Sequence, residues 1–143
     1  MRVSDVMTRD VRMTNPDHTI QEAARLMSEI DTGCLPVAEG DGLVGMITDR
    51  DIAVRAVASG MGPDTPVSQV MSDSVKYCYE DDDTGDVCQN LGELQVRRLP
   101  VLNRDKRLVG ILSLGDVALA DGDGSAGAAL SRISSQTGVA SRA

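Results

Sequence analysis

The spacing of apolar positions predicts a short extended segment, a helix, two strands and a second helix in the first half of the chain. Apolar residues at helical spacing run from Ile20 to Ile30. Two apolar runs, Cys34–Ala38 and Leu43–Ile47, then flank a polar turn and predict a pair of strands. A second helix is predicted from Asp49 to about Ala58, and Val11–Thr14 is predicted to be extended. The predicted order is therefore β-α-β-β-α.

The second half of the chain shows the same order with different residues. Its extended segment is Val75–Tyr79, its strands are Leu99–Leu102 and Leu108–Leu112, and its second helix runs from Leu114 to about Ala120. Its first helix is indicated by apolar residues at the same spacing as before: Val87, Cys88, Leu91 and Leu94.

Helix-start signals support both assignments. Thr19 and Glu22 have the spacing of a capping box, in which each residue's side chain accepts a hydrogen bond from the other's backbone. Asp83 can cap the corresponding helix in the second half. The turns between the strand pairs, Glu39–Gly42 and Asn103–Arg107, are rich in turn-forming residues.

The two halves are copies of one another. Val-Ser-Asp-Val-Met-Thr at 3–8 returns as Val-Ser-Gln-Val-Met-Ser at 67–72, and Leu-Pro-Val at 35–37 returns at 99–101. The segment 43–53 returns at 108–118, so that 12 of 20 compared positions are identical. Chance pairing at ordinary residue frequencies would give roughly one or two. The sequence is therefore a tandem duplication.

The repeat divides the chain into a first domain at 1–60, a linker at 61–66, a second domain at 67–121 and a tail at 122–143. Within the tail, Ala128–Ile133 could form a short helix. A unit of about 60 residues buries barely enough surface to be stable alone, so we expect the two copies to share a core. The expected class is α+β, with α/β-type layers.

Composition narrows the functions that are open to this chain. The net charge is −8 and aromatic residues make up only 1%, which disfavours nucleic-acid binding because phosphates need cations and unpaired bases need aromatic platforms. No apolar run is long enough to cross a membrane, and the first residues lack a signal-peptide pattern. A cytoplasmic protein is expected. With three cysteines in no CxxC spacing and one histidine, a zinc cluster is improbable.

One motif that could bind a ligand occurs in both copies. A strand ends at a hydroxyl residue, and an aspartate follows three residues later, as Thr48 and Asp51 and again as Ser113 and Asp116. Each pair can simply be a capping box that satisfies its own helix. The same groups also suit a ribose phosphate, because a hydroxyl at a helix start can hold phosphate and a carboxylate can accept ribose hydroxyls.

Arginines near this motif could bind a phosphate. Arg98 follows Arg97 directly before the second Leu-Pro-Val, where the first copy has Gly33 and Cys34. Arg50 lies between Thr48 and Asp51. A guanidinium matches phosphate oxygens in bidentate fashion, although each side chain could equally face water. No pairing of a nucleophile with a base is visible, so we expect that the chain is not an enzyme and needs no obligatory cofactor.

Taken in order, these motifs resemble a tandem pair of CBS domains, the arrangement called a Bateman module. The resemblance covers residues 1 to about 121. It implies two β-α-β-β-α repeats packed through their sheets with pseudo-two-fold symmetry, and regulatory binding of AMP, ADP, ATP or S-adenosylmethionine in clefts between them. The resemblance also implies roles for eight residues: Asp51 and Asp116 on ribose hydroxyls, Thr48 and Ser113 on ribose or phosphate, Val11 and Val75 at the base, and Cys34 and Arg98 at the rim.

The resemblance further implies a homodimer that acts on a separate target protein, because no enzyme or channel is attached within the 143 residues. Two alternatives stay open. The chain could be a ligand-free dimerisation or adaptor protein in which the aspartates are caps only, or, least favoured, a nucleic-acid or metal binder.

Overall fold

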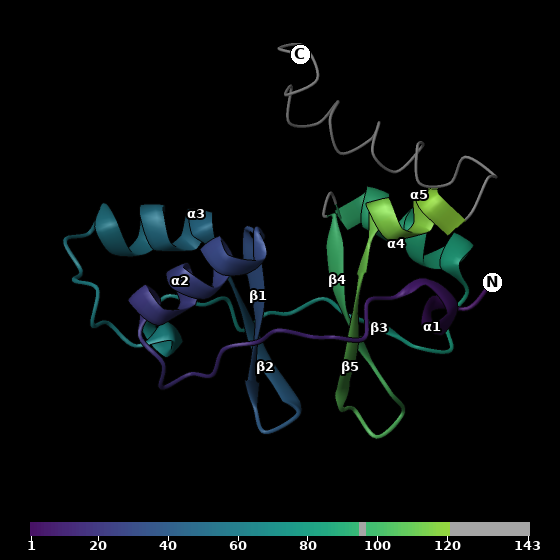
Figure 1. Ribbon diagram of the computed structural model, residues 1–143, viewed down its shortest axis with the longest axis horizontal. Coiled ribbons are helices and arrows are strands. Elements are labelled where there is room, and N and C mark those ends of the chain that lie inside the picture. The colour runs from purple at the N-terminus through teal and green to yellow at the C-terminus, as the bar shows by residue number, and fades with distance from the viewer. Residues whose placement is uncertain (95–96, 121–143) are drawn as a thin grey trace, which may run out of the picture. The chain divides into compact units, whose positions relative to one another are not determined.

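The computed structural model, drawn in Figure 1, describes residues 1–94 and 97–120, with side chains described except at 91–94 and 118–120. The predicted tail at 122–143, its helix at Ala128–Ile133 and the side chains of Leu91 and Leu94 lie outside the described residues. The described residues form two compact units: unit 1 contains Met1–Val11 and the described residues from Lys76 to Ala120, and unit 2 contains Arg12–Val75.

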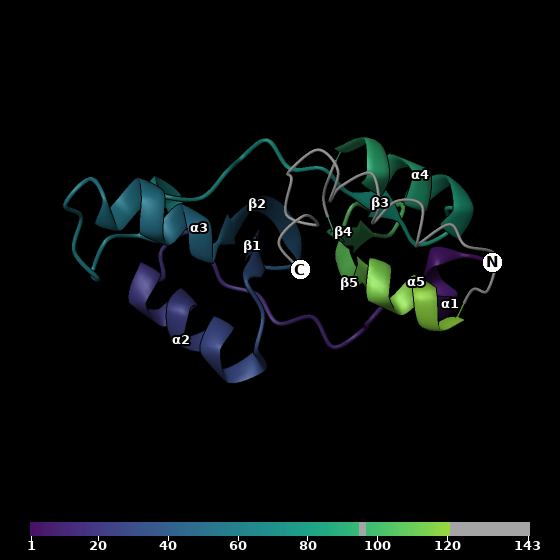
Figure 2. The same cartoon turned by 90° about the horizontal axis from the view of Figure 1, so that it is seen from above.

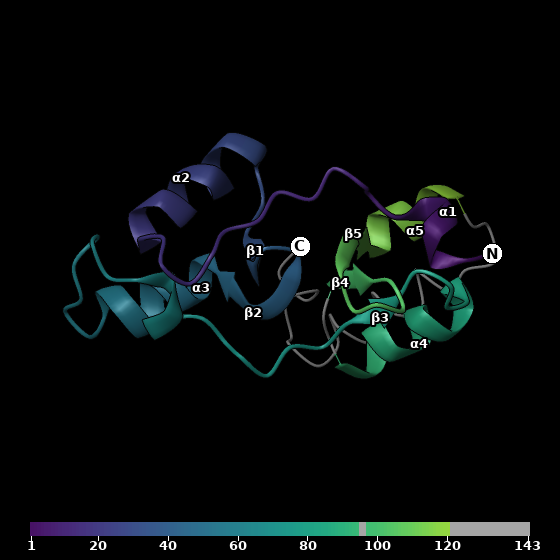
Figure 3. The ribbon, with the colours of Figure 1, turned by 90° about the horizontal axis from the view of Figure 1, so that it is seen from below.

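Unit 2 is built on the predicted strand pair. Strands β1 (Cys34–Glu39) and β2 (Gly42–Thr48) pair antiparallel, and α2 (Ile20–Ile30) lies beside them (Figure 3). The predicted capping box is present, because the Glu22 amide donates to Thr19 Oγ1 at 3.1 Å and the Thr19 amide donates to Glu22 Oε2 at 3.3 Å. In the predicted extended segment Val11–Thr14, Thr14 forms one parallel bridge with Val37 of β1.

The second helix of unit 2 is wound differently from the prediction. Only α3 (Asp49–Asp51) is α-helical, and Ile52–Val57 (η1) forms a π-helix. The Ala58 amide accordingly donates to the carbonyl five residues earlier, on Ala53, at 3.0 Å. The apolar pattern could not reveal this winding, because periodicity indicates a helix but does not distinguish bonds to the fourth residue from bonds to the fifth.

The core of unit 2 includes residues from the start of the second repeat. The short 3-10 helix η2 (Val67–Gln69) places Val67 and Val70 fully inside the cluster formed by α2 and the strands. Ser72 then pairs with Met46 of β2 through two backbone hydrogen bonds of 2.8 and 2.9 Å. The beginning of the second repeat thus packs on the sheet of the first.

Unit 1 contains a three-stranded sheet in the order β3 (Cys78–Tyr79), β4 (Arg98–Leu102), β5 (Leu108–Ser113). Helix α4 (Thr84–Leu94) follows Asp83, whose Oδ2 accepts from the Gly85 amide at 3.0 Å, as the predicted cap requires. Helix α5 (Leu114–Ala120) has the predicted bounds, and α1 (Val3–Val6) lies beside it (Figure 2). The mixed helix and strand content is the predicted α+β class.

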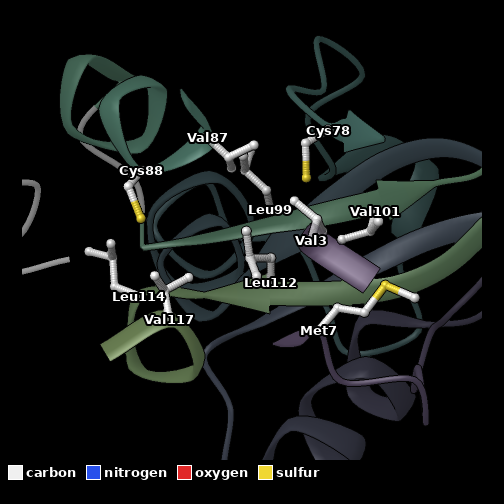
Figure 4. Packing of buried hydrophobic residues seen from close by; sticks show 10 residues of the cluster. All are labelled: Val3, Met7, Cys78, Val87, Cys88, Leu99, Val101, Leu112, Leu114 and Val117. Atoms are coloured by element: carbon white, nitrogen blue, oxygen red, sulfur yellow. The ribbon is translucent and has the colours of Figure 1, made fainter. Parts of the chain in front are cut away.

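The core of unit 1 contains the start of the chain. Val3 of α1 is fully buried and lies among Leu99, Val101 and Leu112 of the sheet (Figure 4). Five residues after Val3, Thr8 exchanges two backbone hydrogen bonds of 2.9 Å with Ile111 of β5. The beginning of the first repeat therefore packs on the sheet of the second.

Packing thus groups the chain differently from its repeats. Residues 1–11 belong to the first repeat and residues 67–75 to the second, yet each segment completes the unit formed by the other repeat. This exchange explains why Val3 and Val67, which are equivalent in sequence, are both fully buried although each stands on a helix of four residues or fewer. Such short helices gain stability only by packing against a sheet.

A buried thiol in unit 1 makes stability depend on alkaline pH. Burial, with a smaller contribution from Asp82, raises the pKa of Cys78 from 9.0 to about 12. Between these values the unfolded chain loses the thiol proton and the folded chain keeps it, so raising the pH favours unfolding. We expect stability to fall from about pH 9 toward pH 12. Urea unfolding across this range should show a weaker decline in Cys78→Ala, and an unchanged decline in that variant would contradict the assignment.

Candidate functional site

The hydroxyl–aspartate motif of unit 2 forms at the junction of β2 and α3. The Asp51 amide donates to Thr48 Oγ1 at 3.0 Å, and the Thr48 amide donates to Asp51 Oδ2 at 3.0 Å. Both side chains are half-buried. The pair is therefore a complete capping box, as the first interpretation of the motif predicted.

Unit 1 repeats this geometry at the junction of β5 and α5. The Asp116 amide donates to Ser113 Oγ at 3.0 Å, and the Ser113 amide donates to Asp116 Oδ2 at 3.2 Å. In each unit the box uses only one oxygen of the carboxylate, Oδ2, so capping does not occupy the second oxygen. A cap and a ligand contact are therefore compatible at the same aspartate.

Strand register places one predicted rim residue beside each motif. Cys34 is the direct partner of Thr48, and Arg98 is the direct partner of Ser113. Directly opposed residues of an antiparallel pair lie on the same face of the sheet. Cys34 is half-buried and Arg98 is exposed, so the corresponding positions of the two units offer a thiol and a guanidinium respectively.

The predicted valines, Val11 and Val75, lie in the two segments that pack on the other repeat. Unit 2 contains Thr48, Arg50 and Asp51 and ends at Val75. Unit 1 contains Ser113, Asp116 and Arg98, and also Val11. Val11 comes three residues after Thr8, which pairs with Ile111 of β5, and Val75 comes three residues after Ser72, which pairs with Met46 of β2. Each set of predicted site residues thus combines both repeats within one unit.

Sequence analysis missed Arg55, which contacts the Asp51 carboxylate. Arg55 Nε lies 3.7 Å from Asp51 Oδ1, and its Nη1 donates at 3.4 Å to the carbonyls of Val70 and Met71. The spacing of four residues on a helix between an acid and a base was the available signal. Arg55 thereby joins the motif of unit 2 to the segment that the second repeat contributes.

A groove of about 270 Å³ lies elsewhere in unit 2, beside Asp49 rather than Thr48. None of the nine predicted residues lines it, because its walls come mostly from α2 and the helix that starts at Asp49: Ala24, Met27, Ser28, Thr32, Asp49 and Ile52.

Three carboxylates of the acidic segment before α4 contact groups within unit 1. Asp81 accepts two hydrogen bonds from Arg104, at 2.7 and 3.0 Å, and this guanidinium holds the pKa of Asp81 below its usual value. Asp82 Oδ2 accepts from the Tyr79 amide, and Asp83 lies 3.5 Å from the terminal amine of Met1. Within the described part of the chain, no group of three or more His, Cys, Asp or Glu side chains could hold a metal ion.

The only histidine in the sequence is likewise engaged. His18 Nδ1 lies 3.1 Å from Thr14 Oγ1, and His18 Nε2 lies 3.1 Å from Asn15 Nδ2. Among residues 1–94 and 97–120, no helix is long and apolar enough to cross a membrane.

The structure thus contains two α+β units, each with a hydroxyl–aspartate pair at the end of a strand. The family model described as "CBS domain" matches residues 3–57 and 67–123. The chain belongs to the CBS-domain family and is a CBS pair, as the motifs predicted.

The chain is similar along most of its length to other proteins of this kind. It is 44% identical over 135 residues to the CBS domain-containing protein YhcV of Bacillus subtilis (strain 168), covering 94% of this chain and 96% of the relative. The crystal structure of CBSX2 in complex with AMP matches with a TM-score of 0.73 and 28% identity, covering 83% of this chain and 94% of that one.

A second solved structure has a different adenosyl ligand. The CBS domain pair of protein MJ0100, in complex with 5-methylthioadenosine and S-adenosyl-L-methionine, matches with a TM-score of 0.74 and 25% identity. The match covers 85% of this chain and 96% of that one. Proteins of this fold thus bind adenosyl ligands both with and without a phosphate.

Proposed function

We propose that this chain senses an adenosyl ligand, either an adenine nucleotide (AMP, ADP or ATP) or S-adenosylmethionine, and passes the signal to a separate partner protein. The observation that carries the proposal is the duplicated carboxylate, which keeps one oxygen outside its capping box in both units. A carboxylate oxygen in that position can accept the hydroxyls of a ribose. The proposal includes a cytoplasmic homodimer without catalytic activity.

The positions of the other predicted residues support the same proposal. Thr48 and Ser113 lie beside the aspartates and would contact ribose or phosphate, with Arg50 or Arg98 nearby for a charged ligand. Val11 and Val75, which belong to the exchanged segments, would line the base pockets. The bound adenosyl compounds of CBSX2 and of protein MJ0100 support this class of ligand.

A second candidate function, a ligand-free adaptor, is favoured by one observation. Both hydroxyl–aspartate pairs form capping boxes, which gives each aspartate a structural role without any ligand. In that case Asp51→Ala and Asp116→Ala would each remove one capping hydrogen bond, cost about 1 kcal/mol of stability and change nothing else.

A thermal-shift titration with AMP, ADP, ATP and S-adenosylmethionine separates the two functions. A ligand at a hundred times its dissociation constant should stabilise the protein by about 2.7 kcal/mol. We expect this shift in the unaltered chain and in Asp64→Ala, which removes an exposed carboxylate in the loop before η2. We expect its loss or reduction in Asp51→Ala or Asp116→Ala. If no compound produces a shift, the adaptor function is favoured.

A further inference from the structure

The groove of unit 2 combines apolar walls with one carboxylate. Its volume of about 270 Å³ is close to that of the smallest pockets that hold small molecules, about 300 Å³. The side chains of Met27, which is buried, and Ile52, which is half-buried, form its apolar part. Asp49 is exposed at the same groove, together with the hydroxyl residue Ser28. This composition suits a molecule that is apolar at one end and polar at the other.

Unit 1 has buried apolar side chains at two positions that are open in this groove. The residue equivalent to Ala24 is Cys88, and the residue equivalent to Asp49 is Leu114. Cys88 is 1% exposed and Leu114 is 6% exposed, and both belong to the core cluster of unit 1, whereas Ala24 and Asp49 are exposed. The fold of the repeat therefore does not need a carboxylate at this position, and in unit 2 an aspartate stands where the other copy completes its core.

The Asp49 carboxylate has one oxygen that no described group uses. Oδ1 accepts from the Arg50 amide at 2.8 Å. Gly33 leaves room for Oδ2, because a Cβ at that glycine would lie 3.0 Å from it. Among the described side chains, none donates a hydrogen bond to Oδ2, and no arginine or lysine lies within 4 Å of it. Oδ2 is thus available to a bound cation.

The end of α2 adds a second preference for positive charge. Met27 and Ser28 lie in its last turn, and the C-terminal end of a helix carries about half a negative charge. Basic residues are favourable at such an end, but the last turn of α2 contains none. It contains Glu29 instead, and Asp31 follows at the C-cap. The helix end and Asp49 together favour a cation in the groove over an anion.

We propose that this groove binds a small organic amine in its protonated form, with the ammonium group at Asp49 and a short apolar body against Met27 and Ile52. An ammonium group has three donors and no acceptor, which suits the carboxylate and the Ser28 hydroxyl at the same groove. The apolar body gains by leaving water for the apolar walls. None of the groove residues is among the predicted adenosyl-binding residues, so this site does not depend on the function proposed above.

Methyl NMR titrations of the full-length chain test the site with molecules of one shape and different charge. Cyclohexylmethylamine is protonated near neutral pH, as lysine is, whereas cyclohexylmethanol is neutral and cyclohexanecarboxylate is an anion. We expect the amine to shift the methyl signals of Met27 and Ile52. We expect it to bind about three- to fivefold more tightly than the alcohol, the upper range for an exposed ion pair, and the anion to bind most weakly.

Three variants assign the contacts. Asp49→Asn keeps the shape of the groove and removes its charge, so the amine and the alcohol should then bind equally. Asp64→Asn is the matched control, because it removes an exposed carboxylate of the same unit outside the groove and should leave the preference for the amine unchanged. Ala24→Leu replaces one good helix former with another and places a larger side chain in the groove, so it should weaken the amine and the alcohol alike.

Three outcomes would overturn the inference and leave adenosyl sensing untouched. Equal binding of the amine and the alcohol to the unaltered chain would mean that Asp49 does not select a cation. Shifts of methyl groups elsewhere, with Met27 and Ile52 unchanged, would place the amine at another site. If no amine binds and the Met27 and Ile52 signals change on dilution of the protein, a second copy of the chain covers the groove. Conversely, amine binding without any adenosyl binding would support the groove and contradict the proposed function.

Discussion

Val67→Asp is expected to unfold unit 2. Val67 is fully buried within the cluster that contains Leu35, Ile47 and Ile20, all of them 3% exposed or less. A carboxylate there would have no cation to pair with inside the cluster. An unpaired buried charge costs about 3 to 5 kcal/mol, which is a large share of the roughly 5 to 15 kcal/mol that stabilises an ordinary domain. Urea unfolding followed by circular dichroism measures the loss.

The neighbouring residue supplies the control for this substitution. Ser68 is exposed, so Ser68→Asp adds the same charge at the same short helix without burying it, and the expected change is within about 0.5 kcal/mol. Val3→Asp should reproduce the large effect in unit 1, because Val3 is the equivalent residue and is also fully buried. Equal unfolding midpoints for Val67→Asp and Ser68→Asp would contradict the packing of the exchanged segment.

Gly45→Ala is expected to have the second largest effect, although it adds only one methyl group. A Cβ at this position would lie 2.8 Å from the carbonyl oxygen of Ser72 and 2.7 Å from the sulfur of Met71. The Ser72 carbonyl is held by the Met46 amide at 2.9 Å, so it cannot retreat without breaking the pairing of the exchanged segment with β2. Overpacking of this kind costs about 1 to 3 kcal/mol, measurable by urea unfolding.

Two other glycines provide comparison substitutions for this prediction. Gly62 has no heavy atom within 4 Å of an added Cβ, so Gly62→Ala should leave stability unchanged or raise it by about 0.4 to 1 kcal/mol. Gly110 is the equivalent of Gly45 in unit 1, where an added Cβ would lie 3.0 Å from the Thr8 carbonyl oxygen and 2.5 Å from the Met7 sulfur. A loss of similar size is expected there. Equal stability of Gly45→Ala and Gly62→Ala would contradict the close approach of residues 71–72 to β2.

The candidate site illustrates why residue types alone left two interpretations open. A hydroxyl residue with an aspartate three positions later is what a capping box needs and also what a ribose contact needs. The structure confirms the box at both motifs and leaves the second oxygen of each carboxylate outside it. What distinguishes Asp51 from Asp116 is Arg55, whose contact with carbonyls of the exchanged segment depends on the tertiary fold.

Sequence alone determined the duplication, the α+β class, the strand pairs and the helix starts at Thr19 and Asp83. These features are local: capping spacing, turn residues and apolar periodicity act within a few positions of the chain, so they can be identified without knowing what each element contacts.

Only the tertiary structure decided which segment completes which core. The segments at 3–8 and 67–72 share four of six residues, including all of the apolar ones, so either could in principle pack on either sheet. Backbone pairing of Thr8 with Ile111 and of Ser72 with Met46 assigns each to the unit of the other repeat. The π-winding after Asp51 and the contacts of Arg55 likewise depend on long-range packing. A periodic pattern does not identify such partners. It indicates that a residue is buried, but it does not indicate which element the residue packs against.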